Sequence, residues 1–137
     1  MMSRPVIVVN RLDAERLQRL IDTTSHKDAA VAEALEVELE RAEVVDPIEV
    51  PANVVSMNSQ VRFTELSRNA QLTRTLVYPH ALANTPEGLS VMAPVGAALL
   101  GLKAGETIDW ALPDGRRIQL RVDEILWQPE AAKQYHR

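Results

Sequence analysis

The sequence predicts an α+β protein in which a short antiparallel helical hairpin precedes an antiparallel β domain with one short helix. Three observations lead to this fold class. Two stretches before residue 46 have apolar residues at helical spacing, Pro47 and Pro51 then interrupt the chain, and short β-branched runs follow. We therefore expect a hairpin over residues 1–46, a linker over 47–53 and a β domain over 54–137.

The first predicted helix begins after Asn10. The Asn10 side chain can cap it, and Asp13 lies three residues further along, as in a capping pattern. The apolar residues that follow on one face are Leu17, Leu20 and Ile21. At 1.5 Å per residue this helix is only about 15 Å long.

The second predicted helix begins near Ser25 and Asp28, which have the spacing of another capping signal. An apolar stripe at spacings of three and four follows: Val31, Ala34, Leu35, Leu39 and Ala42. Two helices with one apolar stripe each and a short loop should pair as an antiparallel hairpin, which here is a short arm. Pro47 and Pro51 cannot continue the second helix, so it ends before them.

The β domain is expected to contain five strands. They are predicted within residues 59–66, 72–79, 88–94, 106–113 and 116–127. Asp114-Gly115 separates the last two and is a strong signal for a two-residue hairpin, because Gly accepts the positive φ that such turns require. Tight turns of this kind favour an antiparallel sheet that is wrapped around the one short helix.

That short helix is predicted within an unusual apolar stretch, residues 89–106, which is too short and too interrupted to span a membrane. Pro94 is suited to the first helical position, and Val95 to Leu100 complete the helix. Gly101 is expected just after its end in the left-handed conformation. Ala97 and Ala98 should let this helix lie close to the sheet.

Composition excludes several classes of function. The chain has no Cys, which excludes disulfides, thiolate catalysis and Cys-ligated zinc. The apolar run from Val6 to Val9 is too short for a signal-peptide core, so we expect a cytoplasmic protein. Aromatic residues are few and scattered, which argues against a base-stacking surface for nucleic acid.

Charge is distributed unevenly along the chain. Residues 13–49 contain eleven acidic and four basic residues, a net charge of −7, whereas residues 54–137 have eight acidic and nine basic residues, a net of +1. An acidic segment repels nucleic acid and favours a positively charged protein surface. A solvated helical face is the alternative explanation, and charge alone favours it.

Candidate catalytic residues are scarce. His26, His80 and His136 lie far apart in the sequence and have no metal-ligand spacing. Asp22 and Asp28 flank the hairpin loop and could hold a divalent cation at the tip, but their positions are also explained as a helix end and a helix cap. The structural explanation is favoured, so we expect no catalytic residue, metal or cofactor.

Several segments resemble a known family. They are "VVSMNSQVRFTEL", "RTLVYP", "LSVMAPVGAALLGLKAGE" and "WQPEAA". Together with the short hairpin, they resemble the bacterial Rnk family of the Gre transcript-cleavage factor superfamily, over nearly the whole chain and most strongly from Met57 to Lys133. The resemblance implies an N-terminal coiled coil and a C-terminal domain with an FKBP-like fold.

The resemblance also implies a docking site for bacterial RNA polymerase at the rim of its secondary channel. The Gre docking strand reads roughly I-S-x-D-S-P, and residues 89–94 read L-S-V-M-A-P. Ser90 and Pro94 match this pattern, and Met92 replaces its acid. We therefore expect Ser90, Met92 and Pro94 to form the polymerase-docking surface.

The hairpin departs from the Gre pattern. Gre factors have a longer coiled coil whose tip acids help to bind catalytic magnesium, whereas the loop here reads "DTTSHKD". The expected function is therefore that of a non-catalytic regulator that competes with Gre factors. The alternative is a stimulator of the polymerase's own RNA cleavage through Asp22 and Asp28. A prolyl isomerase is disfavoured because few aromatic residues are available for an apolar proline pocket.

The expected partners follow from the same resemblance. The Rnk family is described as regulating nucleoside diphosphate kinase, but no residue here specifies contact with that enzyme, so we expect an indirect effect through transcription. We expect a monomer that binds polymerase and makes no contact with a membrane and no sequence-specific contact with nucleic acid.

Overall fold

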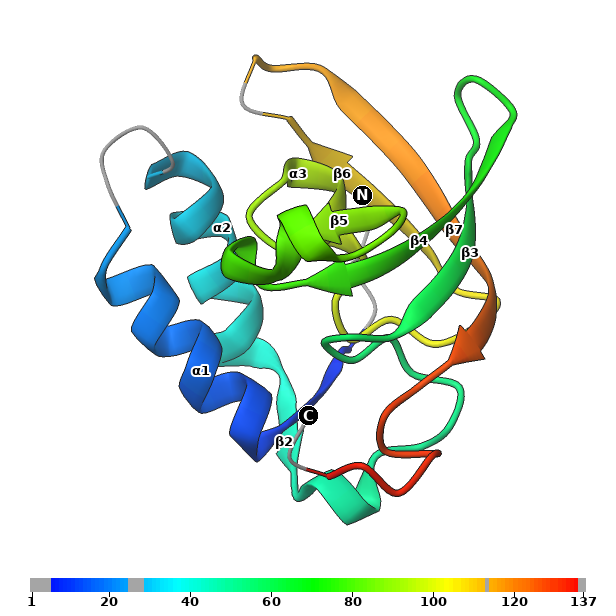
Figure 1. The fold of residues 1–137 in the computed structure, drawn as a ribbon. Coiled ribbons are helices and arrows are strands. Elements are labelled where there is room, and N and C mark those ends of the chain that lie inside the picture. Colours follow the sequence, from blue (N-terminus) through cyan, green and yellow to red (C-terminus); the bar gives the residue numbers. More distant parts are fainter. Residues whose placement is uncertain (1–5, 25–28, 113, 136–137) are drawn as a thin grey trace.

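A pair of helices and a curled sheet lie side by side in the computed structural model of the protein (Figure 1), which describes residues 6–24, 29–112 and 114–135. Helices α1 (Arg11–Asp22) and α2 (Ala29–Arg41) form the expected antiparallel hairpin. The Asn10 side chain accepts a hydrogen bond of 2.7 Å from the Asp13 N–H, which confirms the predicted cap. Ser25 and Asp28 lie outside the described residues, so their predicted capping role stays a prediction.

The sheet has the five expected strands, which makes the fold α+β as predicted. They are β3 (Gln60–Glu65), β4 (Ala70–Val77), β5 (Gly88–Ser90), β6 (Thr107–Ala111) and β7 (Arg117–Trp127). Their order across the sheet is β5-β4-β3-β7-β6. Inward-facing residues of β3 and β7, such as Phe63 and Leu120, form the core together with α3 (Pro94–Leu99).

The sheet is mixed rather than purely antiparallel, which corrects one expectation. Strand β5 pairs with β4 in parallel, with Thr75 opposite Gly88 and Val77 opposite Ser90. Pro79 stops the ladder and begins the 3₁₀ helix η3 (Pro79–Asn84). The chain therefore does not reverse in a tight turn after β4, and the longer connection lets β5 run in the same direction.

A second, two-stranded sheet was not expected from the sequence. Strand β1 (Val8–Asn10) pairs in parallel with β2 (Glu43–Val45), which follows α2. The α1–α2 hairpin is the crossover between these two strands. Val8 also donates a backbone hydrogen bond of 3.2 Å to Gly101, so this small sheet is joined directly to the β domain.

The short helix α3 begins and ends as predicted. Pro94 is its first residue, and Gly101 lies beyond its end with φ at +79°. Helix α3 also lies close to strand β5 at Gly96, because a Cβ on Gly96 would lie 2.1 Å from the Ser90 carbonyl oxygen. Ala97 and Ala98 are buried beside it.

The turn between β6 and β7 is longer than the predicted two residues. Strand pairing ends with Ala111 opposite Arg117, and Leu112 N–H donates a hydrogen bond of 2.7 Å to the Arg116 carbonyl. Gly115 has φ at +88°, which is the conformational role expected of it.

The hairpin and the β domain share one apolar core. Leu17 of α1 and Leu35 of α2 are fully buried in the same cluster as Phe63 and Leu120. Within the predicted linker, residues Pro47–Glu49 form the 3₁₀ helix η2. The division into two units at 47–53 stays a prediction, and the shared core means that any separate β-domain fragment must tolerate the loss of these helical contacts.

Candidate functional site

The predicted docking residues lie in a tight turn that connects β5 to α3. The Ser90 hydroxyl accepts a hydrogen bond of 3.0 Å from the Met92 N–H, and the Ser90 carbonyl accepts one of 3.0 Å from the Ala93 N–H. Gly96 packs against the same carbonyl. These contacts hold the turn in one conformation, while the side chains of Ser90 and Met92 stay partly exposed.

This turn forms one wall of a groove whose other wall is helix α1. One hollow, of about 500 Å³, is lined by Leu20, Thr23, Thr24, Pro79, Ser90, Met92 and Ala93. A second hollow, of about 400 Å³, is lined by Arg16, Arg19, Leu20, Thr23, Tyr78, Pro79 and His80. The two hollows share the lining residues Leu20, Thr23 and Pro79, so they lie next to each other along α1. We call their combined lining the α1 groove.

Pro94 does not belong to the α1 groove. It lines a smaller cavity of about 200 Å³ between α2, α3 and the end of β6, together with Ala30, Val31, Ala34, Trp110, Ala111 and Leu112. The structure thus brings Ser90 and Met92 to one surface and directs Pro94 to another. The role of Pro94 in the turn is to begin α3, which fixes where the exposed turn ends.

The hairpin tip holds Asp22, which is exposed at the end of α1. Its carboxylate accepts a hydrogen bond of 3.0 Å from Gln18 of the same helix. Asp28 lies outside the described residues. Within the part of the chain that the structure describes, no group of three or more His, Asp or Glu residues is placed to hold a metal ion.

A buried polar cluster at the base of the hairpin was not predicted. Asp13 of α1 is 2% exposed and accepts hydrogen bonds from Met57 N–H at 3.1 Å and from the Tyr78 hydroxyl at 3.2 Å. Glu130, near the C-terminus, is 7% exposed and accepts a hydrogen bond of 2.6 Å from the Ser56 hydroxyl. These contacts join α1, the β domain and the C-terminal segment.

Asn10 connects the two buried acids. Its side-chain amide donates to Asp13 at 3.2 Å and to Glu130 at 2.5 Å. The base clamp, as we call Asn10, Asp13, Ser56, Tyr78 and Glu130, therefore holds the first turn of α1 against the β domain. No buried side-chain nitrogen or oxygen in the described residues lacks a hydrogen-bond partner.

Protonation of Asp13 is coupled to this environment. Burial raises the pKa of Asp13 to about 7, and the negative charge of Glu130 adds to the effect, while the Met57 N–H, the Tyr78 hydroxyl and Arg16 oppose it. Burial, assisted by the charge of Asp13, raises the pKa of Tyr78 well above its ordinary value. The cluster therefore holds a carboxyl that exchanges its proton near neutral pH.

Sequence reasoning missed the base clamp because its signals had local explanations. Asn10 and Asp13 were accounted for as a helix cap, and Glu130 lies in a segment, "WQPEAA", that mattered only for the family resemblance. In the same segment, the Gln128 amide donates 2.8 Å hydrogen bonds to the carbonyls of Pro51 and Val54. Gln128 and Glu130, two polar residues directly after β7, were the available signal that the C-terminal segment packs against the β domain.

Comparison with known proteins places this arrangement in a family. Residues 5–45 match the family described as Rnk N-terminus, and residues 50–126 match Transcription elongation factor, GreA/GreB, C-term. The chain is 49% identical over 134 residues to the regulator of nucleoside diphosphate kinase from Escherichia coli strain K12, with 98% of each chain covered. The chain belongs to the Rnk family. It is thereby related to the GreA and GreB transcription elongation factors.

More distant and structural relatives agree with this assignment. A solved structure described as a prokaryotic transcription elongation factor GreA/GreB from Nitrosomonas europaea is 45% identical, with a TM-score of 0.69 over 90% of this chain and 100% of that one. Transcription elongation factor GreA of Clostridium botulinum strain Alaska E43 is 33% identical over 81 residues, which cover 59% of this chain and 51% of GreA.

In this Rnk-family chain, the α1 groove lies where the two matched regions meet. Its α1 wall belongs to the Rnk N-terminal match, and its other wall, from Tyr78 to Ala93, belongs to the GreA/GreB match. Helix α1 therefore adds residues that are specific to the Rnk half to a surface of the GreA/GreB-type domain.

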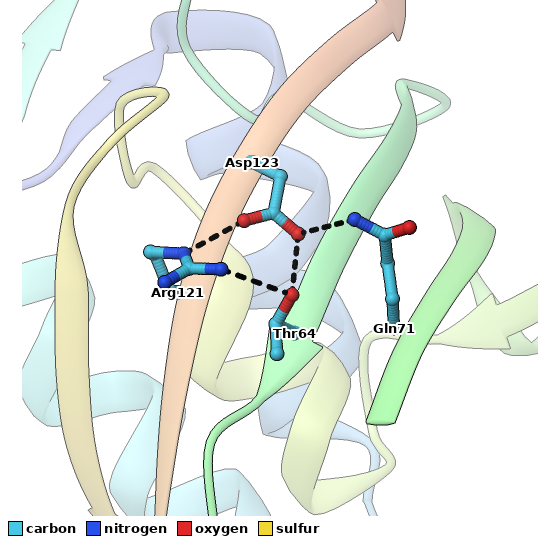
Figure 2. Close-up of polar contacts among 4 residues, drawn as sticks. All are labelled: Thr64, Gln71, Arg121 and Asp123. Carbon is cyan, nitrogen blue, oxygen red and sulfur yellow. Dashed lines mark hydrogen bonds and ion pairs between the residues drawn. The ribbon is translucent and has the colours of Figure 1, made fainter. Parts of the chain in front are cut away.

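The outer face of the sheet carries a separate polar cluster (Figure 2). Asp123, the extra residue of a bulge in β7, accepts hydrogen bonds from Thr64 at 2.6 Å, Arg121 at 2.8 Å and Gln71 at 3.2 Å. Partial burial alone would raise the pKa of Asp123, but these donors together hold it below its ordinary value. The cluster spans β3, β4 and β7, and its groups bond to one another, so it stabilises the sheet.

Proposed function

We propose that this Rnk-family protein binds bacterial RNA polymerase at the rim of the secondary channel and competes there with Gre factors without promoting RNA cleavage. The observation that carries the proposal is the turn from Ser90 to Ala93. It is held by its own hydrogen bonds, partly exposed, and located where the Gre docking pattern is matched by Ser90. A surface that is already in one conformation loses little freedom when a partner binds.

The non-catalytic part of the proposal is supported by the hairpin. Metal-assisted cleavage requires carboxylates held together near magnesium, which tolerates little deviation from ligand distances of about 2.0–2.1 Å. Asp22 is an exposed side chain held by one hydrogen bond within its own helix. The arm is also short, because helices of 12 and 13 residues reach only about 18 and 20 Å.

An effect on nucleoside diphosphate kinase would then arise through transcription. The proposed partner also places the protein in the cytoplasm. No helix in the described part of the chain is long and apolar enough to cross a membrane.

The indirect effect on nucleoside diphosphate kinase can be tested with purified components. Purified protein added to purified nucleoside diphosphate kinase should leave the kinase rate unchanged, whereas a dose-dependent change would establish direct regulation instead.

The docking surface is tested by charge introduction at Met92. Met92→Arg replaces an apolar lining residue of the groove by a longer side chain whose charge must lose water in the contact, and it should weaken binding to purified polymerase by about tenfold or more. Val37→Arg is the matched control, because Val37 is an apolar residue of α2 that is 48% exposed and lies outside the groove lining. Unchanged binding by Met92→Arg, with an unchanged circular dichroism spectrum, would place the docking surface elsewhere.

RNA cleavage assays on stalled elongation complexes distinguish competition with a Gre factor from stimulation of cleavage by this protein. The protein alone should leave RNA cleavage at its basal rate, and it should inhibit cleavage that is stimulated by a Gre factor. Stimulation by the protein alone, abolished in an Asp22→Asn, Asp28→Asn double variant, would establish the alternative function. Absence of inhibition at saturating protein would remove the shared site.

A further inference from the structure

We infer that the α1 groove takes an acidic segment of a protein partner, in which an apolar side chain is flanked by Asp or Glu, and that Arg19 recognises its charge. This inference rests on the proposed function, because the segment belongs to the partner that docks at the Ser90–Ala93 turn. The inference adds two statements to that proposal. Helix α1 is part of the docking surface, and the segment of the partner that binds there is acidic with one apolar side chain.

The first support is the distribution of charge around the groove. Residues 13–49 have a net charge of −7, yet two of their four basic residues, Arg16 and Arg19, line the groove. No acidic residue is among the described residues that line either hollow. The lining of the groove therefore differs in charge from the hairpin segment as a whole.

Two acidic residues of the hairpin, Asp13 and Glu36, are engaged away from the groove. Asp13 is buried in the base clamp, and Glu36 accepts a hydrogen bond of 3.3 Å from Gln18, on the side of α1 that faces α2. Arg16 lines the groove together with Tyr78, and its positive charge lowers the pKa of both Asp13 and Tyr78. Arg19 is exposed one turn further along α1.

The second support is the apolar floor between these cations and the turn. Leu20 and Pro79 line both hollows, Met92 lines the larger one, and Met adapts its shape to a bound apolar group. The groove follows α1 from Arg16 to Thr23, which is about two helical turns or 10 Å. A bound segment could place an apolar side chain on Leu20, Pro79 and Met92 and an acidic side chain beside the arginines of α1. Short segments bind in grooves of other proteins through a similar combination of contacts.

The same features argue against a phosphate backbone as the occupant. A nucleic acid would use the two arginines but would leave the apolar floor without a matching group, because its outer surface is charged. A protein segment buries apolar area and pairs charge in the same contact. The structure therefore favours a protein, and nucleic acid becomes an outcome that the experiment can distinguish.

The test is a charge reversal on the exposed part of α1 in the full-length protein. Arg19→Glu should weaken binding to purified bacterial RNA polymerase by about tenfold, slow association and reduce the salt dependence of binding. Arg11→Glu is the matched control on the same helix. It makes the same charge change at an exposed residue whose ion pair with Asp46 lies away from the groove, and its binding should stay within about twofold of the unmodified protein.

The outcomes separate this inference from the proposed function. Failure of the unmodified protein to bind polymerase removes both. Loss of binding in Met92→Arg with normal binding in Arg19→Glu keeps the docking turn and overturns the composite groove. Binding of a single-stranded RNA oligonucleotide that Arg19→Glu abolishes, or a dimer in gel filtration that Arg19→Glu dissociates, would overturn the acidic partner in favour of RNA or of a second copy.

Discussion

The base and the tip of the hairpin use carboxylates in opposite ways. At the base, Asp13 and Glu130 are 2% and 7% exposed, and hydrogen bonds from Asn10, Ser56 and Tyr78 hold their oxygens. At the tip, Asp22 is exposed and accepts one hydrogen bond within its own helix. The well-defined acids of this protein therefore orient the arm, and the acid at its end has no comparable geometry.

This difference has a physical origin in the cost of burial. A buried carboxyl is tolerated only if its polar atoms are satisfied, and satisfying them fixes its position. An exposed carboxylate is solvated wherever it points, so nothing local fixes it. The arm is thus held at its base in one orientation, which places Arg16 and Arg19 on the same hollow as Tyr78, Pro79 and His80.

The largest expected effect is loss of stability when the base clamp is broken. Asp13→Ala removes the acceptor for Met57 N–H and the Tyr78 hydroxyl, and we expect the free energy of unfolding to fall by about 2–4 kcal/mol. Urea unfolding followed by circular dichroism measures this. Asp22→Ala, which removes an exposed acid from the same helix, is the control. Equal stability of the two variants would contradict the asymmetry between base and tip.

A second expected effect is a pH dependence of protein stability that arises from Asp13, at the base of the hairpin. The pKa of Asp13 is raised from 3.8 to about 7, so the folded protein binds a proton that the unfolded chain has lost between these values. The free energy of unfolding should therefore fall as pH rises from about 4 to about 7, by up to about 1.4 kcal/mol per pH unit, and Asp13 should add no slope above that range.

The variant Asp13→Asn isolates this contribution because its side chain does not titrate. Its unfolding free energy, measured in urea from pH 4 to pH 8, should show a flatter dependence on pH than the unmodified protein. Asp22→Asn should keep the original slope. Parallel pH profiles for the unmodified protein and Asp13→Asn would mean that Asp13 is ionised throughout.

A smaller effect is expected where the hairpin joins the β domain. Ile48 is 73% exposed in η2, so a protease that cleaves after Glu should reach Glu49. We expect cleavage to leave a folded fragment that begins at Val50 and contains the whole β domain from Val54 onward. Glu130→Gln, by weakening the base clamp, should accelerate release of the hairpin. Mass spectrometry of timed digests identifies the fragment, and uniform resistance to cleavage would count against the boundary.

The smallest effect is expected at the tip. Asp22→Asn should change the free energy of unfolding by less than about 0.5 kcal/mol, because it removes one exposed hydrogen bond. It should also leave inhibition of Gre-stimulated cleavage unchanged. A clear loss of inhibition in this variant would assign the tip a role that the structure does not indicate.

The sequence by itself determined the parts of the fold that depend on neighbouring residues. Periodic apolar residues defined α1 and α2, Asn10 capped α1, and Pro94 and Gly101 marked the two ends of α3. The five strands followed from β-branched runs bounded by turn residues. These signals act over one to four residues, so they can be recognised before the chain folds.

The tertiary structure alone decided which of these parts meet. Asn10 and Glu130 are 120 positions apart, and β1 pairs with β2 across the whole hairpin. The α1 groove likewise joins Arg19 to Met92 through no pattern in the intervening residues. Such contacts depend on how apolar faces pack and on which buried polar groups can satisfy one another, and both are properties of the folded chain rather than of any local stretch.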